Sequence, residues 1–126
     1  MRNNREYQIC KDIAIYLRLQ YPKVIFHFDL AGLNLSRAQA GMMKAIQGGR
    51  GWPDLFISEP KGNYHGLFIE IKTDEFKAMK KDGTYVTTHI EEQVDMLRRL
   101  RARLYKTAMA VGFDNCKKLI DDYLND

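Results

Sequence analysis

Two neighbouring stretches decide the fold of this chain: Gly49-Arg50-Gly51-Trp52-Pro53-Asp54-Leu55-Phe56-Ile57, then Gly66-Leu67-Phe68-Ile69-Glu70-Ile71-Lys72. They predict two short apolar strands, the first preceded by an acid and the second ending in acid, apolar residue and base. Because side chains alternate along a strand, Glu70 and Lys72 point to the same face. If the strands pair through a loop over residues 58–65, Asp54 lies beside them. Two carboxylates and a lysine at one strand end indicate a place for Mg²⁺ next to a phosphate.

Pro53-Asp54 followed by Glu70-Ile71-Lys72 resembles the PD-(D/E)xK nuclease signature. The longer context of Gly-Trp-Pro-Asp-Leu, Phe-Ile-Glu-Ile-Lys and a later helix with Gln93 is similar to the VRR-Nuc branch, and the resemblance spans residues 6–111. An E-x-K triplet alone occurs by chance in lysine-rich proteins, but Gly-Trp-Pro-Asp before a strand with Glu-Ile-Lys is far more specific. The resemblance implies an α/β fold with a restriction-endonuclease-like core, a mixed sheet of about four strands flanked by helices.

The same resemblance implies hydrolysis of phosphodiester bonds in DNA, with Mg²⁺ or Mn²⁺ as the cofactor. Asp54 and Glu70 are the expected metal ligands, and the backbone carbonyl of Ile71 is expected to add a third oxygen. Lys72 would orient a water, take its proton or neutralise the charge of the transition state, and the sequence leaves these three roles open.

Two further residues are candidates for the same site. Glu6 falls on the apolar face of a helix predicted over residues 5–20, where a carboxylate costs free energy unless a cation or hydrogen bonds meet it. It is either a third acid at the metal, as the resemblance implies, or a first-turn acid favoured by the helix dipole. Gln93 lies at the edge of the apolar stripe of a helix predicted to begin near His89. It either bonds to loop backbone or, as the resemblance implies, contacts the water or the scissile phosphate near Lys72.

The net charge of +4 permits a nucleic-acid partner without requiring one. The glycine-rich run around Arg50 either contacts a DNA phosphate or only forms the turn before the strand, and Trp52 either packs in the core or stacks on a base. With no zinc-finger spacing, we expect recognition of nucleic-acid shape rather than of base sequence. The predicted nucleic-acid contacts are Lys44, Arg50, Gly51, Trp52, Lys77, Lys80 and Lys81.

Length and composition predict a single domain over residues 1–126, with an ordinary hydrophobic fraction of 45%. No apolar run approaches the roughly 18 residues of a membrane span, and the first residues lack the apolar core of a secretion signal. Cys10 and Cys116 fit neither a disulfide framework nor a zinc site, so both are expected to be reduced and packed. These features favour a cytoplasmic protein with no membrane partner. A short autonomous nuclease of the kind that the resemblance implies would suit a bacterium or a phage-infected cell.

The remaining elements follow from periodicity and capping signals. Strands are predicted at residues 24–28 and 105–111. A helix is predicted at 36–47, with a packing stripe of Met42, Met43 and Ile46, and another at 115–124, capped by Asp114. The helix between them is capped by Thr88 and has an apolar stripe of Ile90, Val94, Leu97, Leu100 and Leu104.

Three alternative functions stay open. The first is a nucleic-acid-binding module without catalysis, against which the intact Asp54, Glu70 and Lys72 argue. The second is a sequence-specific restriction-type endonuclease, and the third is an interaction domain in which Glu70 and Lys72 form a surface ion pair worth roughly 0–1 kcal/mol. Analogy with junction resolvases favours a homodimer acting on branched DNA, such as a Holliday junction.

Overall fold

The structure is a computed structural model that describes residues 4–29, 35–73, 81–84 and 87–125. Within these residues, helices and strands follow one another in the order α1 (Asn4–Gln20), β1 (Phe26–Phe28), α2 (Arg37–Ile46), β2 (Leu55–Ile57), β3 (Leu67–Lys72), α3 (Thr88–Arg101), β4 (Lys106–Val111) and α4 (Gly112–Leu124). None of the described helices has the length and apolar character needed to cross a lipid bilayer.

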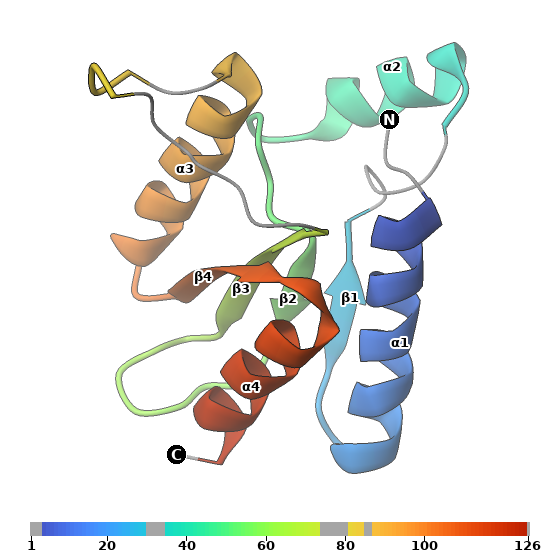
Figure 1. The fold of residues 1–126 in the computed structure, drawn as a ribbon, viewed down its shortest axis with the longest axis vertical. Helices are drawn as coiled ribbons and strands as arrows, with labels where there is room; N and C mark the ends of the chain where they lie inside the picture. The colour runs from blue at the N-terminus through green and yellow to red at the C-terminus, as the bar shows by residue number, and fades with distance from the viewer. Residues whose placement is uncertain (1–3, 30–34, 74–80, 85–86, 126) are drawn as a thin grey trace.

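The four strands form one mixed sheet in the order β1-β2-β3-β4. The β1–β2 and β2–β3 pairs are antiparallel, and β3 pairs with β4 in parallel. Helices α1 and α4 pack on one face of the sheet and α3 on the other, while α2 stands apart above the sheet edge (Figure 1). The predicted α/β architecture with a mixed four-stranded sheet is therefore confirmed.

Strand β3 is the centre of the core because both of its faces are covered. Leu67, Ile69 and Ile71 pack in the larger hydrophobic cluster with residues of α1 and α4. Phe68 belongs to a second cluster with Met96 of α3. The alternation that places Phe68 on the α3 side also places Glu70 and Lys72 there. A near-continuous apolar run covered on both faces is typical of such a central strand.

Helix α2 does not pack as predicted. Met42 and Ile46 are 70% and 78% exposed, and α2 has no buried residue. The expected stripe was therefore wrong for these two side chains, because the helix lies away from the sheet (Figure 1). The capping box at its start is present, with the Ser36 hydroxyl accepting from the Gln39 N–H and the Gln39 side chain accepting from the Ser36 N–H.

Helix α3 begins at Thr88, the residue that was predicted to be its N-cap, so it starts one residue earlier than expected. The N-cap is Thr87, whose hydroxyl accepts from the backbone N–H of Ile90 at 3.0 Å, so Thr88 is the first helical residue. Leu104, which was expected in the apolar stripe, follows the helix with a left-handed φ of 69° and is 53% exposed. The helix ends at Arg101 instead of continuing to Leu104, because the chain turns there into β4.

Helix α4 begins at Gly112, three residues before the predicted start. Asp114 lies in its first turn rather than at the cap. The side chain of Asn115 accepts a hydrogen bond from the Val111 N–H at 2.8 Å, so this residue satisfies the backbone at the β4–α4 junction. Strand β1 is also shorter than predicted, covering Phe26–Phe28 only.

The two cysteines are buried thiols, as predicted, with Cys10 on α1 and Cys116 on α4. Burial raises the pKa of the Cys116 thiol to about 12, and the nearby Cys10 adds to the shift. The thiolate is the reactive form of cysteine, so Cys116 is an inert packing residue rather than a nucleophile.

Asp121 of α4 joins α1 to α4 by polar contacts. It accepts hydrogen bonds from the hydroxyls of Tyr16 at 2.5 Å and Tyr21 at 2.6 Å, and from Lys117 at 2.9 Å. Burial raises the pKa of Asp121, but these hydrogen bonds outweigh burial and leave it below the ordinary value. Burial and the bond to Asp121 raise the pKa of Tyr21 to about 12.

We expect the contacts of Asp121 with Tyr16, Tyr21 and Lys117 to make the free energy of unfolding fall at alkaline pH. The folded-state pKa of Tyr21 lies above the ordinary tyrosine value of 10.0, so its protonated hydroxyl stabilises the fold fully below pH 10, and this contribution is lost as the pH rises toward 12. Urea denaturation of Tyr21→Phe at pH 8 to 11 should show lower stability at pH 8 and a smaller fall toward pH 11 than the parent protein. Tyr7→Phe, at an exposed tyrosine, is the control. An equal fall in all three proteins would contradict the assignment.

Candidate metal centre

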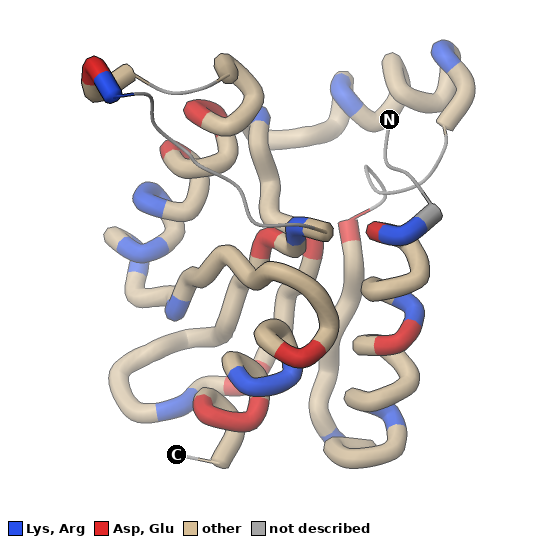
Figure 2. The backbone as a smooth tube through the Cα atoms, in the orientation of Figure 1, with Lys and Arg blue, Asp and Glu red and all other residues tan. Residues whose placement is uncertain are grey.

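Three carboxylates from separate parts of the chain meet where β2 begins and β3 ends, at the ends of the two central strands of the sheet. One oxygen from each of Glu6, Asp54 and Glu70 can be chosen so that all three lie within 4.8 Å of one another. Glu6 comes from the first turn of α1, Asp54 directly precedes β2, and Glu70 is in β3. Asp54 is fully buried and Glu70 is 1% exposed. Figure 2 shows acidic positions from α1 and from the strands gathered at these strand ends.

Strand pairing brings Asp54 and Glu70 together. Leu55 pairs with Ile69 in the antiparallel β2–β3 register, so the next pair along the two strands is Asp54 and Glu70. Asp54 Oδ2 accepts a hydrogen bond from the backbone N–H of Ile71 at 2.7 Å. The carboxylate is therefore oriented by β3 itself, which is a reason for an acid immediately before β2.

Gln93 links the acid and the base of the Glu70-Ile71-Lys72 triplet. Its Nε2 donates to Glu70 Oε2 at 2.8 Å, and its Oε1 accepts from Lys72 Nζ at 2.7 Å. The Lys72 ammonium also lies 3.5 Å from Glu70 Oε2. Gln93 is 5% exposed, so its two ends are bonded to site residues rather than to water. The structure thus brings all five predicted catalytic residues into one region, while their catalytic roles stay a prediction.

His89 is a neighbour of this network that the sequence did not single out. Its Nε2 lies 3.2 Å from Gln93 Nε2, one turn away on α3. Residues four apart on a helix share a face, so the spacing from Gln93 was the available signal. Since the Gln93 amide nitrogen is a donor, the His89 Nε2 is the acceptor in this contact.

The loop before β2 packs directly on the backbone of α3. Gly51 has a left-handed φ of 78°, and a Cβ on it would lie 2.5 Å from the backbone carbonyl of Glu92 and 2.7 Å from the Gln93 nitrogen. The Arg50 guanidinium lies 3.7 Å from the Glu92 carboxylate, with 69% of the Arg50 side chain exposed. The close approach of Gly51 to the backbone of Glu92 and Gln93 sets the distance from the loop to α3, so it also positions Gln93.

The other predicted nucleic-acid contacts are spread over the surface. Lys44 on α2 and Lys81 are exposed. Trp52 is half-buried and packs on Phe68 with ring centroids 6.1 Å apart. Lys77 and Lys80 lie outside the described residues. A role of these side chains in binding nucleic acid stays a prediction.

The donor set suits a hard divalent cation. Carboxylate oxygens are the ligands that Mg²⁺ and Mn²⁺ prefer, and here three acids converge with two of them buried. Burying several like charges costs free energy, and a cation among them lowers that cost. Glu6, Asp54 and Glu70 would hold the ion. The carbonyl of Ile71 as a fourth donor stays a prediction.

Comparison with solved structures finds a chain described as "VRR_NUC domain protein" with a TM-score of 0.66 and 24% sequence identity. The match covers 99% of this chain and 92% of that chain. No protein-family model matches the sequence, and no curated protein matches it. The two chains share their fold over nearly their whole lengths, so the restriction-endonuclease-like architecture expected from the sequence is confirmed.

Proposed function

We propose that this chain is a metal-dependent DNA nuclease of the VRR-Nuc family and hydrolyses phosphodiester bonds. The observation that carries the proposal is the convergence of Glu6, Asp54 and Glu70 next to the Lys72–Gln93 pair, in a chain with the fold of a VRR_NUC domain protein. An interaction domain needs no such arrangement, since a surface ion pair contributes roughly 0–1 kcal/mol.

Each residue has a role that its contacts support. Bound Mg²⁺ or Mn²⁺ would polarise the phosphate and lower the pKa of the attacking water. Glu6, Asp54 and Glu70 would hold the ion. Lys72 donates its hydrogen bond to Gln93 and lies beside Glu70, which supports a role in neutralising negative charge on the phosphate rather than in accepting a proton. Gln93 holds the amine in that position.

The substrate we propose is branched or junction-containing DNA, cut by a homodimer. The net charge of +4 favours association with a polyanion, and the charged residues lie within the nuclease fold itself. The exposed Ile46 of α2 offers apolar surface for pairing with a second copy. Light scattering of the purified protein tests the dimer, and a mass of one chain at micromolar concentration would contradict it.

Incubation with a four-way junction, a flap and a plain duplex tests the nuclease activity. We expect Mn²⁺-dependent cleavage, with the branched substrates cut faster than the duplex. Tight binding without cleavage of any substrate would instead identify a non-catalytic binding module, and discrete fragments from plasmid DNA would identify a restriction-type enzyme. Calorimetric titration with Mn²⁺ provides an independent measurement, and absence of binding would favour an interaction domain.

Replacing Gln93 by leucine is expected to lower kcat by roughly 10–100-fold with little change in KM, which is typical when a residue that orients metal ligands is lost. The substitution removes both hydrogen bonds that join Glu70 and Lys72 while keeping a side chain of similar size in the buried position. Steady-state cleavage of a junction substrate measures the effect. Gln8→Leu, at an exposed glutamine of α1, is the matched control. Equal kcat values for the two variants would remove Gln93 from the mechanism.

A further inference from the structure

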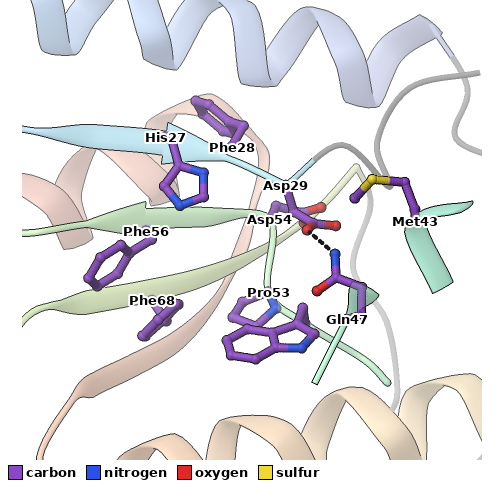
Figure 3. Close-up of a pocket in the computed structure, with 10 residues that line it drawn as sticks. His27, Phe28, Asp29, Met43, Gln47, Pro53, Asp54, Phe56 and Phe68 are labelled. Carbon is purple, nitrogen blue, oxygen red and sulfur yellow. Dashed lines mark hydrogen bonds between the residues drawn. The ribbon is translucent and has the colours of Figure 1, made fainter. Parts of the chain in front are cut away.

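A pocket opens directly beside the carboxylate cluster (Figure 3). Its volume is about 400 Å³, within the range of roughly 300–1,000 Å³ that is usual for sites that bind small organic molecules. Asp54 contributes to both the cluster and the pocket wall, and Pro53 lies next to it in the wall. A group bound in the pocket would therefore be adjacent to a phosphate held at the carboxylates.

One side of the pocket is aromatic. The rings of His27, Phe56 and Phe68 lie together on this side (Figure 3). Phe56 and Phe68 are stacked with centroids 4.4 Å apart, and the His27 ring meets Phe56 edge-on at 6.1 Å. These residues come from β1, β2 and β3, so the platform rests on the sheet. Planar π-systems stack well on such surfaces.

The other side of the pocket carries polar groups. The amide of Gln47 donates to Asp29 Oδ1 at 3.2 Å (Figure 3), which is long for such a bond. Trp52 also lines the pocket, and its indole N–H is buried with no acceptor among the residues that the structure describes. An unsatisfied buried donor costs free energy, so a ligand with an acceptor on its edge would be stabilised here.

We propose that this pocket receives one unpaired nucleobase of the substrate, from a nucleotide next to the phosphate that is cut. A nucleobase has the two features that the pocket complements: a flat aromatic face for the rings, and an edge of donors and acceptors for Gln47, Asp29 and Trp52. The proposal rests on the proposed nuclease function. It adds a reason for selecting branched DNA, because unpaired bases at a branch enter the pocket without loss of base pairing.

Two adjacent methionines of α2 provide a matched test. Met43 lines the pocket, whereas Met42 is 70% exposed and does not line it. Met43→Trp fills the pocket with a larger ring, and Met42→Trp makes the same change outside it. Because α2 has no buried residue, neither substitution disturbs the core. Circular dichroism checks that both variants fold. Trp52→Phe is a third variant that keeps a ring and removes the indole N–H.

The experiment compares two duplexes that each carry one bulged nucleotide, either a thymidine or an abasic residue. Fluorescence anisotropy gives Kd with Mn²⁺, in a Lys72→Ala background so that the DNA is not turned over. We expect binding to be roughly tenfold tighter with the thymidine, from stacking of the base. Met43→Trp should remove this preference, Trp52→Phe should reduce it, and Met42→Trp should retain it.

Equal affinity for the two duplexes in the parent background, or an undiminished preference in Met43→Trp, would overturn the proposal. Failure of the proposed function is distinguishable from this result. A wild-type protein that cleaves no DNA would overturn the nuclease assignment, while the comparison of base with abasic residue still reports on the pocket. Conversely, normal cleavage without any preference for the base would leave the nuclease assignment intact and exclude the base pocket.

Discussion

Asp54→Asn is expected to reduce Mn²⁺-dependent cleavage by roughly 10³-fold or more. Loss of one charged ligand weakens binding of the ion. A bound cation stabilises the transition state by several kcal/mol, and each 1.36 kcal/mol changes the rate by a factor of about ten. The effect should appear as a fall in the cleavage rate of a junction substrate at saturating Mn²⁺. Asp122→Asn removes the same charge on an exposed part of α4 and should leave the rate unchanged.

The same substitution should change stability in a way that a disrupted fold would not. Asn keeps an acceptor oxygen for the Ile71 N–H, so the strand contact is preserved. It also removes one charge from three carboxylates whose oxygens approach within 4.8 Å, where two unit charges repel by roughly 3 kcal/mol at an effective dielectric constant of 20. We therefore expect Asp54→Asn to raise the Tm without metal and to lose most of the rise in Tm caused by Mn²⁺. An equal Mn²⁺ effect in both proteins would exclude Asp54 as a ligand.

The centre of the fold could be predicted from sequence because its signals are local. The two stretches predicted to contain short apolar strands do contain them, as β2 (Leu55–Ile57) and β3 (Leu67–Lys72). Their pairing across a short loop then brings Asp54 to Glu70, since antiparallel neighbours along the chain commonly pair. Alternation along β3 places Glu70 and Lys72 together without knowledge of the rest of the molecule.

Features that depend on partners distant in the chain could not be predicted. The pattern of Met42 and Ile46 indicates an apolar helix face, but periodicity says nothing of whether a packing partner exists, and here α2 has none in the described core. Thr87 and Thr88 are both competent caps, and tertiary context selects the first. His27 falls within the strand predicted at residues 24–28, but nothing in that pattern indicates that it lines a pocket with residues of β2 and β3.

The contact of Gly51 with α3 is the least visible of these features from sequence, and it leads to the second prediction. Gly51→Ala is expected to destabilise the protein by about 2–5 kcal/mol, from left-handed backbone strain of about 1–2 kcal/mol and overpacking of about 1–3 kcal/mol. The new methyl group would lie 2.5 Å from the backbone of Glu92, and backbone cannot rotate away as a flexible side chain does. Urea denaturation measures the change in the free energy of unfolding.

Gly62→Ala separates strain from crowding. Gly62 has a φ of 55°, also left-handed, but a Cβ there meets nothing within 4 Å among the described atoms. We expect a loss of about 1–2 kcal/mol from backbone strain alone. If the two variants are equally destabilised, the loop does not press on α3.

If Gly51→Ala is the more destabilised variant, α3 must shift to admit the methyl group. Gln93 must shift as well, because its backbone nitrogen would lie 2.7 Å from that methyl group. The Lys72–Gln93–Glu70 bonds would then lengthen, so Gly51→Ala should lower kcat in the protein that remains folded, whereas Gly62→Ala should not.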